Sequence, residues 1–311
     1  MEDVGTPANS AKQGAYVNGT RVKSDQWRAL PHGKSRPVEH REDSIETLFH
    51  ERLARKYPLS SQVPVTAAAS TKRLRAVWDS CGARIDFARF REDVFAALQY
   101  AYDHKYGVWD NVNDLRTLYP NSWHTCILPY MSSLKPGARI LGVGINDGRE
   151  IRQLFDDRHA NLDLLDISVK AIGRLAHQLR DYSHVRSFVG TFEDWVPDYE
   201  EYDLFFTLRT LNCTAVDRNA SIRKSIELVR PGGTLVYSVA NGYAYLDNGV
   251  LKALNGMYSY ETGTIDVQRP REIANEIREQ VDLGGARVLK LAEYPTEIFV
   301  VAAKEPSPQA T

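Results

Sequence analysis

The 311-residue sequence has few cysteines and no visible metal-binding motif. Its three cysteines, Cys81, Cys126 and Cys213, are far apart, with no Cys-x-x-Cys pair and no cysteine–histidine group at zinc spacing. The eight histidines include no His-x-His or His-x-x-x-His pair. We therefore expect no metal site, and buried free thiols that suit a reducing cytoplasm.

Long apolar runs and an excess of one charge are also lacking. No stretch approaches the roughly 18 consecutive apolar residues of a membrane span, and the first residues, including Glu2 and Asp3, do not resemble a signal peptide. Lys plus Arg (39) nearly equal Asp plus Glu (40). Because no global field favours nucleic acid or an anionic membrane, we expect neither as a partner.

A glycine-rich stretch separates a strand pattern from a helix pattern at residues 138–155. The apolar run 140–143 meets Gly144 and Gly148, and apolar residues then recur at helical spacing in 151–155. Gly144 allows a tight turn, Gly148 allows close approach of the backbone to a ligand, and a new helix offers free N–H groups. This pattern predicts a binding site for a small ligand.

The next predicted strand, residues 162–166, is apolar and ends in Asp166. An acid at the tip of the second strand, about twenty residues after a glycine loop, is placed to bridge the two hydroxyls of a ribose. Together the two features indicate a nucleoside cofactor.

The spacing of the glycines distinguishes between cofactors. The dinucleotide pattern Gly-x-Gly-x-x-Gly is one residue shorter than the stretch from Gly142 to Gly148. The pattern acid-x-Gly-x-Gly-x-Gly fits this stretch in register, and here the chain resembles the class I S-adenosylmethionine-dependent methyltransferases. The chain departs from the family at Gly142, where the family has the acid, and at Asn146, where the family has the middle glycine.

Other segments resemble the family's motifs in the same order, within residues 136–304. Residues 166–172 resemble the ribose acid and the helix after it, 188–195 the adenine-flanking segment, 202–207 the fourth strand, and 228–238 the Pro-Gly-Gly turn and fifth strand. In segment 188–195, Thr191 replaces the family's common acid, and Glu193 or Asp194 are the candidate substitutes. The resemblance implies S-adenosyl-L-methionine as cofactor, bound by Gly142, Gly144, Asn146, Gly148, Asp166, Ile167, Phe192, Glu193, Asp194 and Thr207.

The alternation of strand and helix patterns predicts an α/β fold with a doubly wound, mostly parallel sheet. The resemblance implies a seven-stranded Rossmann-like methyltransferase fold, in which the hairpin of runs 286–293 and 297–303 supplies the antiparallel last strand. We expect a flexible polar tail at 1–43, a helical extension at 44–135 with helices at 45–56, 66–80 and 87–106, the cofactor-binding core at 136–304, and a short tail at 305–311.

Three residues are candidates for the acceptor side of the site. Thr207 ends the fourth strand where metal-dependent catechol methylases have an acid, so a metal is not expected. Arg209 either grips an acidic acceptor or forms a structural salt bridge. Tyr106, with Tyr102 and Trp109, either faces the sulfonium from a lid or packs the extension onto the sheet.

Several functional alternatives remain open. The chain lacks the Asn/Asp-Pro-Pro-aromatic motif of amino-group methylases of nucleic acids and proteins, which favours a small-molecule methyltransferase. The departures at Gly142 and Asn146 favour instead an enzyme that uses another cofactor carbon, by aminocarboxypropyl transfer or ring closure with release of methylthioadenosine. A non-enzymatic binding module is disfavoured by the retained Gly144, Gly148 and Asp166. The loop 240–270, rich in tyrosine, either holds substrate or is stapled by its tyrosines. Neither acceptor nor oligomeric state is specified.

Overall fold

The computed structural model describes the chain in segments. These are residues 15–17, 20–22, 45–57, 59, 63, 71–80, 85–110, 126–146, 148, 151, 160–199, 201–211, 216–240, 258–259, 264–265, 269–293 and 297–306. Most of the helix expected after the glycine loop, at 151–155, and most of the tyrosine-rich segment 240–270 lie outside these residues.

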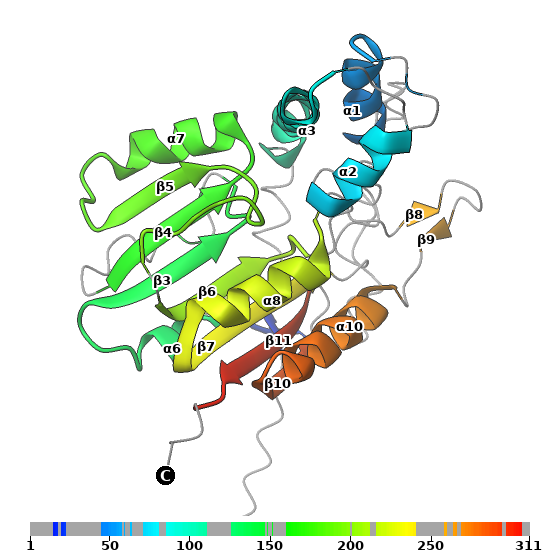
Figure 1. Ribbon diagram of the computed structural model, residues 1–311. Helices are drawn as coiled ribbons and strands as arrows, with labels where there is room; N and C mark the ends of the chain where they lie inside the picture. Colours follow the sequence, from blue (N-terminus) through cyan, green and yellow to red (C-terminus); the bar gives the residue numbers. More distant parts are fainter. Residues whose placement is uncertain are drawn as a thin grey trace, which may run out of the picture.

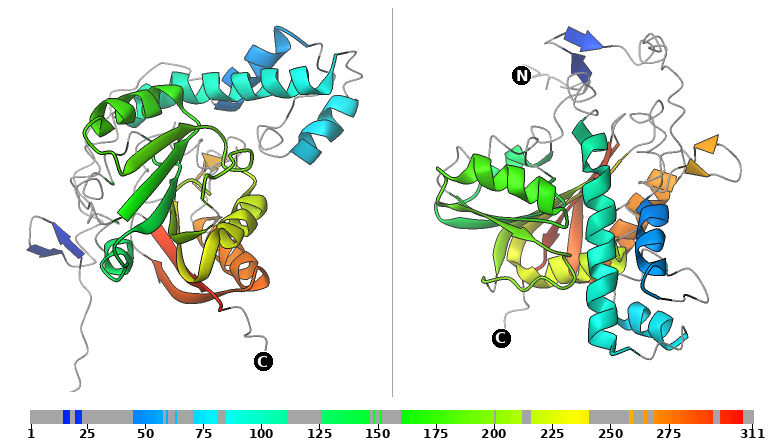
Figure 2. Two further views of the ribbon diagram at one scale, coloured as in Figure 1. Left: turned by 60° about the vertical axis from the view of Figure 1, so that its left-hand side comes forward. Right: turned by 90° about the horizontal axis from the view of Figure 1, so that it is seen from above.

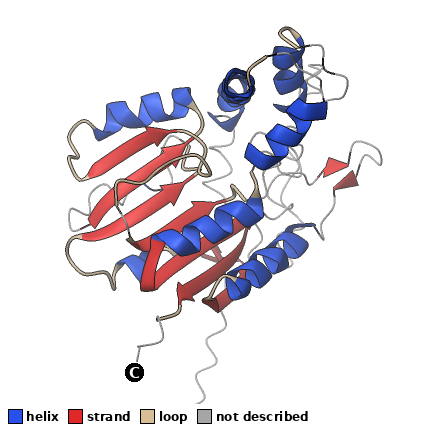
Figure 3. Ribbon diagram, viewed as in Figure 1, coloured by secondary structure: helices blue, strands red, loops and turns tan. Residues whose placement is uncertain are grey.

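A seven-stranded sheet forms the centre of the structure, in the order β10-β11-β7-β6-β3-β4-β5 (Figures 1 and 3). Its strands are β3 (Ala138–Val143), β4 (Ala160–Asp166), β5 (Val185–Val189), β6 (Tyr202–Leu208), β7 (Val229–Ala240), β10 (Ala286–Glu293) and β11 (Glu297–Lys304). The pairs from β7 through β6, β3 and β4 to β5 are parallel, whereas β11 is antiparallel to β7 and β10. The predicted doubly wound, mostly parallel, Rossmann-like sheet is confirmed.

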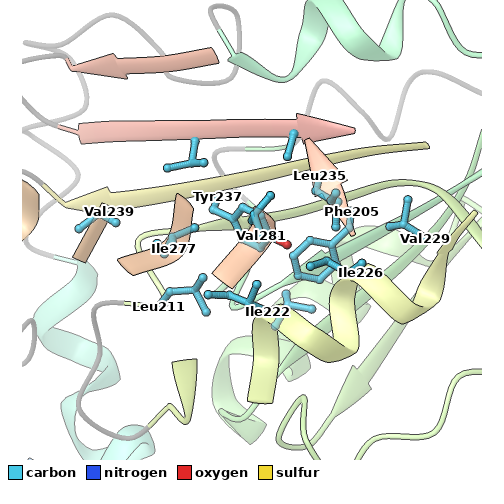
Figure 4. Close-up of a cluster of buried hydrophobic side chains, with 14 of the residues drawn as sticks. Phe205, Leu211, Ile222, Ile226, Val229, Leu235, Tyr237, Val239, Ile277 and Val281 are labelled. Atoms are coloured by element: carbon cyan, nitrogen blue, oxygen red, sulfur yellow. The ribbon is translucent and has the colours of Figure 1, made fainter. Parts of the chain in front are cut away.

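Buried apolar residues cover both faces of this sheet, as parallel strands require. Leu204 and Phe206 of β6 join a cluster with residues of α6 (Leu128–Met131) and α7 (Val169–Leu179). Phe205, between them in the sequence, points to the opposite face, because side chains alternate along a strand. There it joins a cluster with α8 (Arg218–Leu228) and α10 (Arg269–Leu283), part of which Figure 4 shows.

The helical extension has a hydrophobic core of its own. It consists of α1 (Ile45–Ala54), α2 (Thr71–Ser80) and α3 (Phe87–Asp110). α1 and α3 begin at the predicted residues and α2 ends at the predicted one, whereas residues 66–70 of the second predicted helix lie outside the described residues. Phe49 and Phe90 are fully buried in this core. The long α3 runs from α1 and α2 to α7, with which it is in contact (Figure 2).

Four short strands form two further hairpins. β1 (Ala15–Val17) and β2 (Thr20–Val22) are antiparallel and lie within the predicted flexible tail. β8 (Tyr258–Ser259) and β9 (Thr264–Ile265) pair in the same way. Among the described helices, none combines the length and apolar character needed to cross a membrane.

Candidate functional site at the switch point of the sheet

The sheet reverses its direction of growth between β3 and β6. From β3 the chain builds outward through β4 to β5, and it then returns to place β6 on the other side of β3. In open α/β sheets, ligands bind beyond the carboxyl ends of the strands at such a switch point. In Figure 1, the arrowheads of β3 and β4 point toward the side on which α1, α2 and α3 lie.

Side chains of β6 and of the residues after it pack against glycines at the end of β3, Gly142 within the strand and Gly144 just after it. Gly142 pairs with Phe206, and a Cβ atom at position 142 would lie 2.5 Å from Cζ of that ring. Gly144 has a φ of 69°, and a Cβ atom there would lie 1.9 Å from Thr210 Oγ1. A side chain at position 142 would therefore displace the Phe206 ring, and one at position 144 would also strain the backbone. The packing of the phenylalanine ring accounts for glycine at position 142, where the family has an acid.

Asp166 and the glycine loop are joined by main-chain hydrogen bonds. The carboxylate accepts one bond at Oδ2 from Asn146 N (2.8 Å) and one at Oδ1 from Ser168 N (2.9 Å). Gly144 N donates to the carbonyl of Leu165 (2.8 Å), which brings the loop against the end of β4. Burial raises the pKa of Asp166, and the amide donors oppose this by lowering it. The structure thus brings the predicted ribose acid and glycine loop together.

Two residues at this edge of the sheet have an unusual backbone conformation. Within the described part of the chain, the non-glycine residues with positive φ are Asn146 (54°) and Arg209 (55°), which follow β3 and β6. Such conformations are costly for most residues and concentrate at functional sites, although asparagine tolerates them better than others. Asn146 therefore replaces the family's glycine without changing the backbone conformation that glycine would favour.

The predicted adenine-flanking segment lies beside β6. Phe192 is buried, and its ring centroid lies 5.5 Å from that of Phe205. Glu193 Oε1 accepts a hydrogen bond from Ser221 Oγ of α8 (2.9 Å), and burial raises the pKa of this carboxyl group. Asp194 forms an ion pair with Arg91 of α3. Both candidate acids are therefore engaged by protein groups.

On the acceptor side, Thr207 and Arg209 lie at the end of β6. Thr207 is fully buried, and its Oγ1 has no hydrogen-bond partner among the described residues. Arg209 donates its main-chain N–H to Ser238 Oγ (2.9 Å) and its Nη1 to Glu297 Oε1 (2.6 Å). Glu297 is buried, so Arg209 takes part in the salt bridge that was one of its two expected roles.

Polar contacts tie the helical extension to this edge. Ser168 Oγ donates to Asp103 Oδ1 of α3 (2.6 Å), and Lys170 Nζ donates to the carbonyl of Asp103 (3.1 Å). Arg73 of α2 forms an ion pair with Asp217, the residue that caps α8, with 3.3 Å between Arg73 Nη2 and Asp217 Oδ2. With the Arg91–Asp194 pair described above, α2 and α3 contact the segments that follow β4, β5 and β6.

Of the remaining predicted site residues, the structure describes the contacts of two and leaves the side chain of a third undescribed. Ile167 packs against the hydrophobic cluster of the extension. Gly148 has a φ of 72° and donates its N–H to the carbonyl of Ile145. Tyr106 lies on α3, but its side chain is outside the described part of the structure, as is that of Trp109.

Sequence reasoning missed Asp103, Ser168 and Glu297. Ser168 carried a signal, because a serine immediately before an apolar helical pattern predicts an N-cap, and its Oγ accepts from Ala171 N (3.1 Å). Asp103 and Glu297 carried none, because their partners are distant in the sequence. Among the described residues, no group of three or more histidine, cysteine, aspartate or glutamate side chains is arranged to hold a metal ion.

No protein-family model and no curated protein matches the chain. Similar solved structures include a complex between the Haloferax volcanii Trm112 methyltransferase activator and the putative methyltransferase (14% identity, covering 67% of this chain and 99% of that chain, TM-score 0.46). Another is a SAM-dependent methyltransferase from Aquifex aeolicus (13% identity, covering 62% of this chain and 98% of that chain, TM-score 0.44). A third is a putative S-adenosylmethionine-dependent methyltransferase from Listeria monocytogenes (14% identity, covering 60% of this chain and 98% of that chain, TM-score 0.44). At these identities and TM-scores, the similarities identify neither substrate nor reaction.

The contact between Gly142 and Phe206 leads to a stability prediction. Gly142→Ala should lower the free energy of unfolding by about 2 kcal/mol, because the added methyl group overpacks the ring. Gly173→Ala, in α7, is the matched control, since its Cβ meets nothing within 4 Å. That change should stabilise the protein by up to about 1 kcal/mol through helix propensity.

Urea denaturation of these two variants, of Phe206→Leu alone and of Gly142→Ala combined with Phe206→Leu measures this effect. The combined change should cost less than the sum of the single changes, because the smaller side chain makes room for the methyl group. Additive costs, or no cost for Gly142→Ala, would show that the two residues do not restrict each other.

Proposed function

We propose that the protein is an S-adenosyl-L-methionine-dependent transferase that methylates a small molecule. The observation that carries this proposal is the Asp166 carboxylate, fixed at the tip of β4 by main-chain amides on either side of it, one of them in the glycine loop. A carboxylate oxygen that accepts one amide hydrogen bond retains a further lone pair for a hydroxyl donor. The acid is thus oriented to bridge the two hydroxyls of a ribose beside a glycine-rich turn.

The neighbouring residues fit the rest of this cofactor. Phe192 and Ile167 offer apolar surface for the adenine, and Glu193 or Asp194 offers an acceptor for its amino group. The glycine loop allows its main chain to approach a ligand closely, which suits the methionine half of the cofactor. In this proposal that half contacts Gly142, Gly144, Asn146, Gly148 and Thr207. Thr207 belongs to this set through its position beside Val143, at the end of β3 from which the glycine loop begins.

The cofactor supplies a methyl group on a sulfonium, and the protein's contribution is to align the acceptor with it. Such an in-line displacement gains most from positioning, so neither a metal nor a dedicated base is needed. We assign Thr207, Arg209 and Tyr106 to the acceptor side. Glu297 partly neutralises Arg209, so the guanidinium acts as an oriented hydrogen-bond donor more than as a net positive charge.

In this proposal the core and the helical extension have different roles. Residues 136–304 hold the cofactor, and the extension at 44–135 covers it, with α2 and α3 held by ionic and polar contacts to the segments after β4, β5 and β6. The balanced charge and the missing Asn/Asp-Pro-Pro-aromatic motif favour a small-molecule acceptor. The small number of cysteines and their wide spacing favour a cytoplasmic location.

Removing the ribose acid tests the proposal. Asp166→Ala should weaken binding of S-adenosylmethionine and S-adenosylhomocysteine by about 2 kcal/mol, or about thirtyfold, because two charge-assisted hydrogen bonds are lost. Asp181→Ala, at an exposed carboxylate after α7, should bind like the wild type. Titration calorimetry measures all three proteins, and equal affinity of wild type and Asp166→Ala would refute the assignment.

The raised pKa of Asp166 predicts a pH dependence of binding. Ribose hydroxyls donate to the ionised carboxylate, so affinity should be constant above the pKa of Asp166 and fall as pH drops through it. Because burial raises that pKa, the fall should begin at a higher pH than for an exposed aspartate. Asp166→Asn should bind more weakly and lack this pH dependence. A wild-type affinity that stays constant down to the ordinary range, about pH 4, would contradict the role of Asp166.

A second candidate reaction is favoured by Asn146, whose amide stands in the glycine loop where the family has no side chain. Its donor and acceptor groups can orient the methionine amine, which in ring closure attacks a carbon of the same cofactor and releases methylthioadenosine. The contact of Gly142 with Phe206 weakens this alternative, since packing accounts for the other departure from the family pattern.

Incubating the purified protein with S-adenosylmethionine alone separates the two reactions. Methyl transfer requires an acceptor and leaves S-adenosylhomocysteine, so no methylthioadenosine should accumulate above the uncatalysed background. Chromatography of the nucleoside products measures this. Accumulation that is abolished by Asn146→Gly, a change that the φ of 54° tolerates, would establish ring closure instead.

A further inference from the structure

Lys224 of α8 makes all its described hydrogen bonds to one short stretch of main chain. Its Nζ donates to the carbonyls of Phe192 (2.6 Å), Glu193 (3.1 Å) and Trp195 (2.5 Å). An ammonium group has three N–H donors, so its full donor capacity is directed at segment 188–195. The same Nζ lies 5.2 Å from the ring centroid of Phe192.

This arrangement places a charge where burial disfavours it. Burial lowers the pKa of Lys224, while the nearby carboxylates of Glu193 and Asp194 raise it. A partly buried ammonium is stable only when hydrogen bonds replace its water, and here carbonyls of an irregular segment do so. The lysine and the segment therefore satisfy each other, and removing the lysine leaves three carbonyls without this donor.

α8 also holds the segment through a second residue. Ser221, one turn before Lys224, donates its hydroxyl to Glu193 Oε1 (2.9 Å). Residues three apart lie on the same face of a helix, so one face of α8 fixes both the main chain of the segment and its acid side chain.

We propose that Lys224 is a positioning residue for recognition of the nucleobase. It holds Phe192 and Glu193 in the arrangement that contacts adenine, without touching the cofactor itself. This inference rests on the proposed function, in which segment 188–195 flanks the adenine. It assigns adenine specificity to α8, a helix outside the predicted cofactor site.

The test compares two ligands that differ only in the base. S-adenosylhomocysteine carries an exocyclic amine, which donates a hydrogen bond, and S-inosylhomocysteine carries a carbonyl there, which accepts one. Wild type should prefer the adenine ligand by about tenfold, the effect of one hydrogen bond. Lys224→Met should bring the ratio of the two affinities to within about twofold of one. Lys304→Met is the matched control, since its Nζ donates to the carbonyl of Glu227, also in α8.

Calorimetry with both ligands separates the possible outcomes. Asp166→Ala should weaken both ligands and preserve their ratio, and Lys304→Met should change neither. If Lys224→Met does not fold, Lys224→Gln keeps a long side chain with fewer donors and should reduce the ratio at least twofold. Normal binding with an unchanged ratio in the folded Lys224 variant, or no base preference in wild type, overturns this inference alone. Wild type that binds neither ligand overturns the proposed function as well.

Discussion

The packing of Phe206 and Thr210 against two glycines is the constraint on which the candidate site depends. Because Gly142 and Gly144 lack Cβ atoms, the Phe206 ring and the Thr210 side chain occupy the space that a Cβ atom would need. This contact sets the position of the glycine loop at the switch point, where Gly144 reaches the end of β4 and Asn146 donates to Asp166. One packing requirement thus determines where the glycine loop meets Asp166, the candidate ribose-binding acid.

The environment of Asp166 connects the helical extension to the candidate site. Ser168 donates its amide to Asp166 and its hydroxyl to Asp103, so a single residue contacts both the candidate ribose acid and α3. Arg91 joins α3 to Asp194 in the same way. The extension therefore contacts the candidate site through charged and polar groups and through Ile167, which packs against the apolar core that keeps α1 and α3 together.

Local patterns predicted most of the fold and much of the candidate site. β6 and the hairpin of β10 and β11 agree with the predicted ranges to within one residue, because apolar runs between turn residues specify strands directly. The meeting of the glycine loop with Asp166 follows from parallel strand order. The Lys224 contacts, by contrast, join segments about thirty residues apart through an irregular turn, for which a single sequence has no periodic signal. The Glu297 partner of Arg209 was hidden for the same reason.

The structure also offers an explanation for each residue at which the sequence departs from the methyltransferase pattern. Gly142 is explained by the ring of Phe206 and Asn146 by its left-handed conformation, so neither requires a different reaction. Thr191, which replaces the family's acid, donates its hydroxyl to Asp194 (3.2 Å), which keeps an acid in that segment. Each of these departures thus has a local explanation in packing, backbone conformation or a neighbouring acid.

The most direct test of this account is a crystal structure of the protein with S-adenosylhomocysteine. We predict that both ribose hydroxyls lie about 3 Å from the carboxylate oxygens of Asp166, with the adenine beside segment 188–195 and the homocysteine toward Gly144 and Thr207. A ligand bound elsewhere, or a ribose that makes no contact with Asp166, would contradict the central claim.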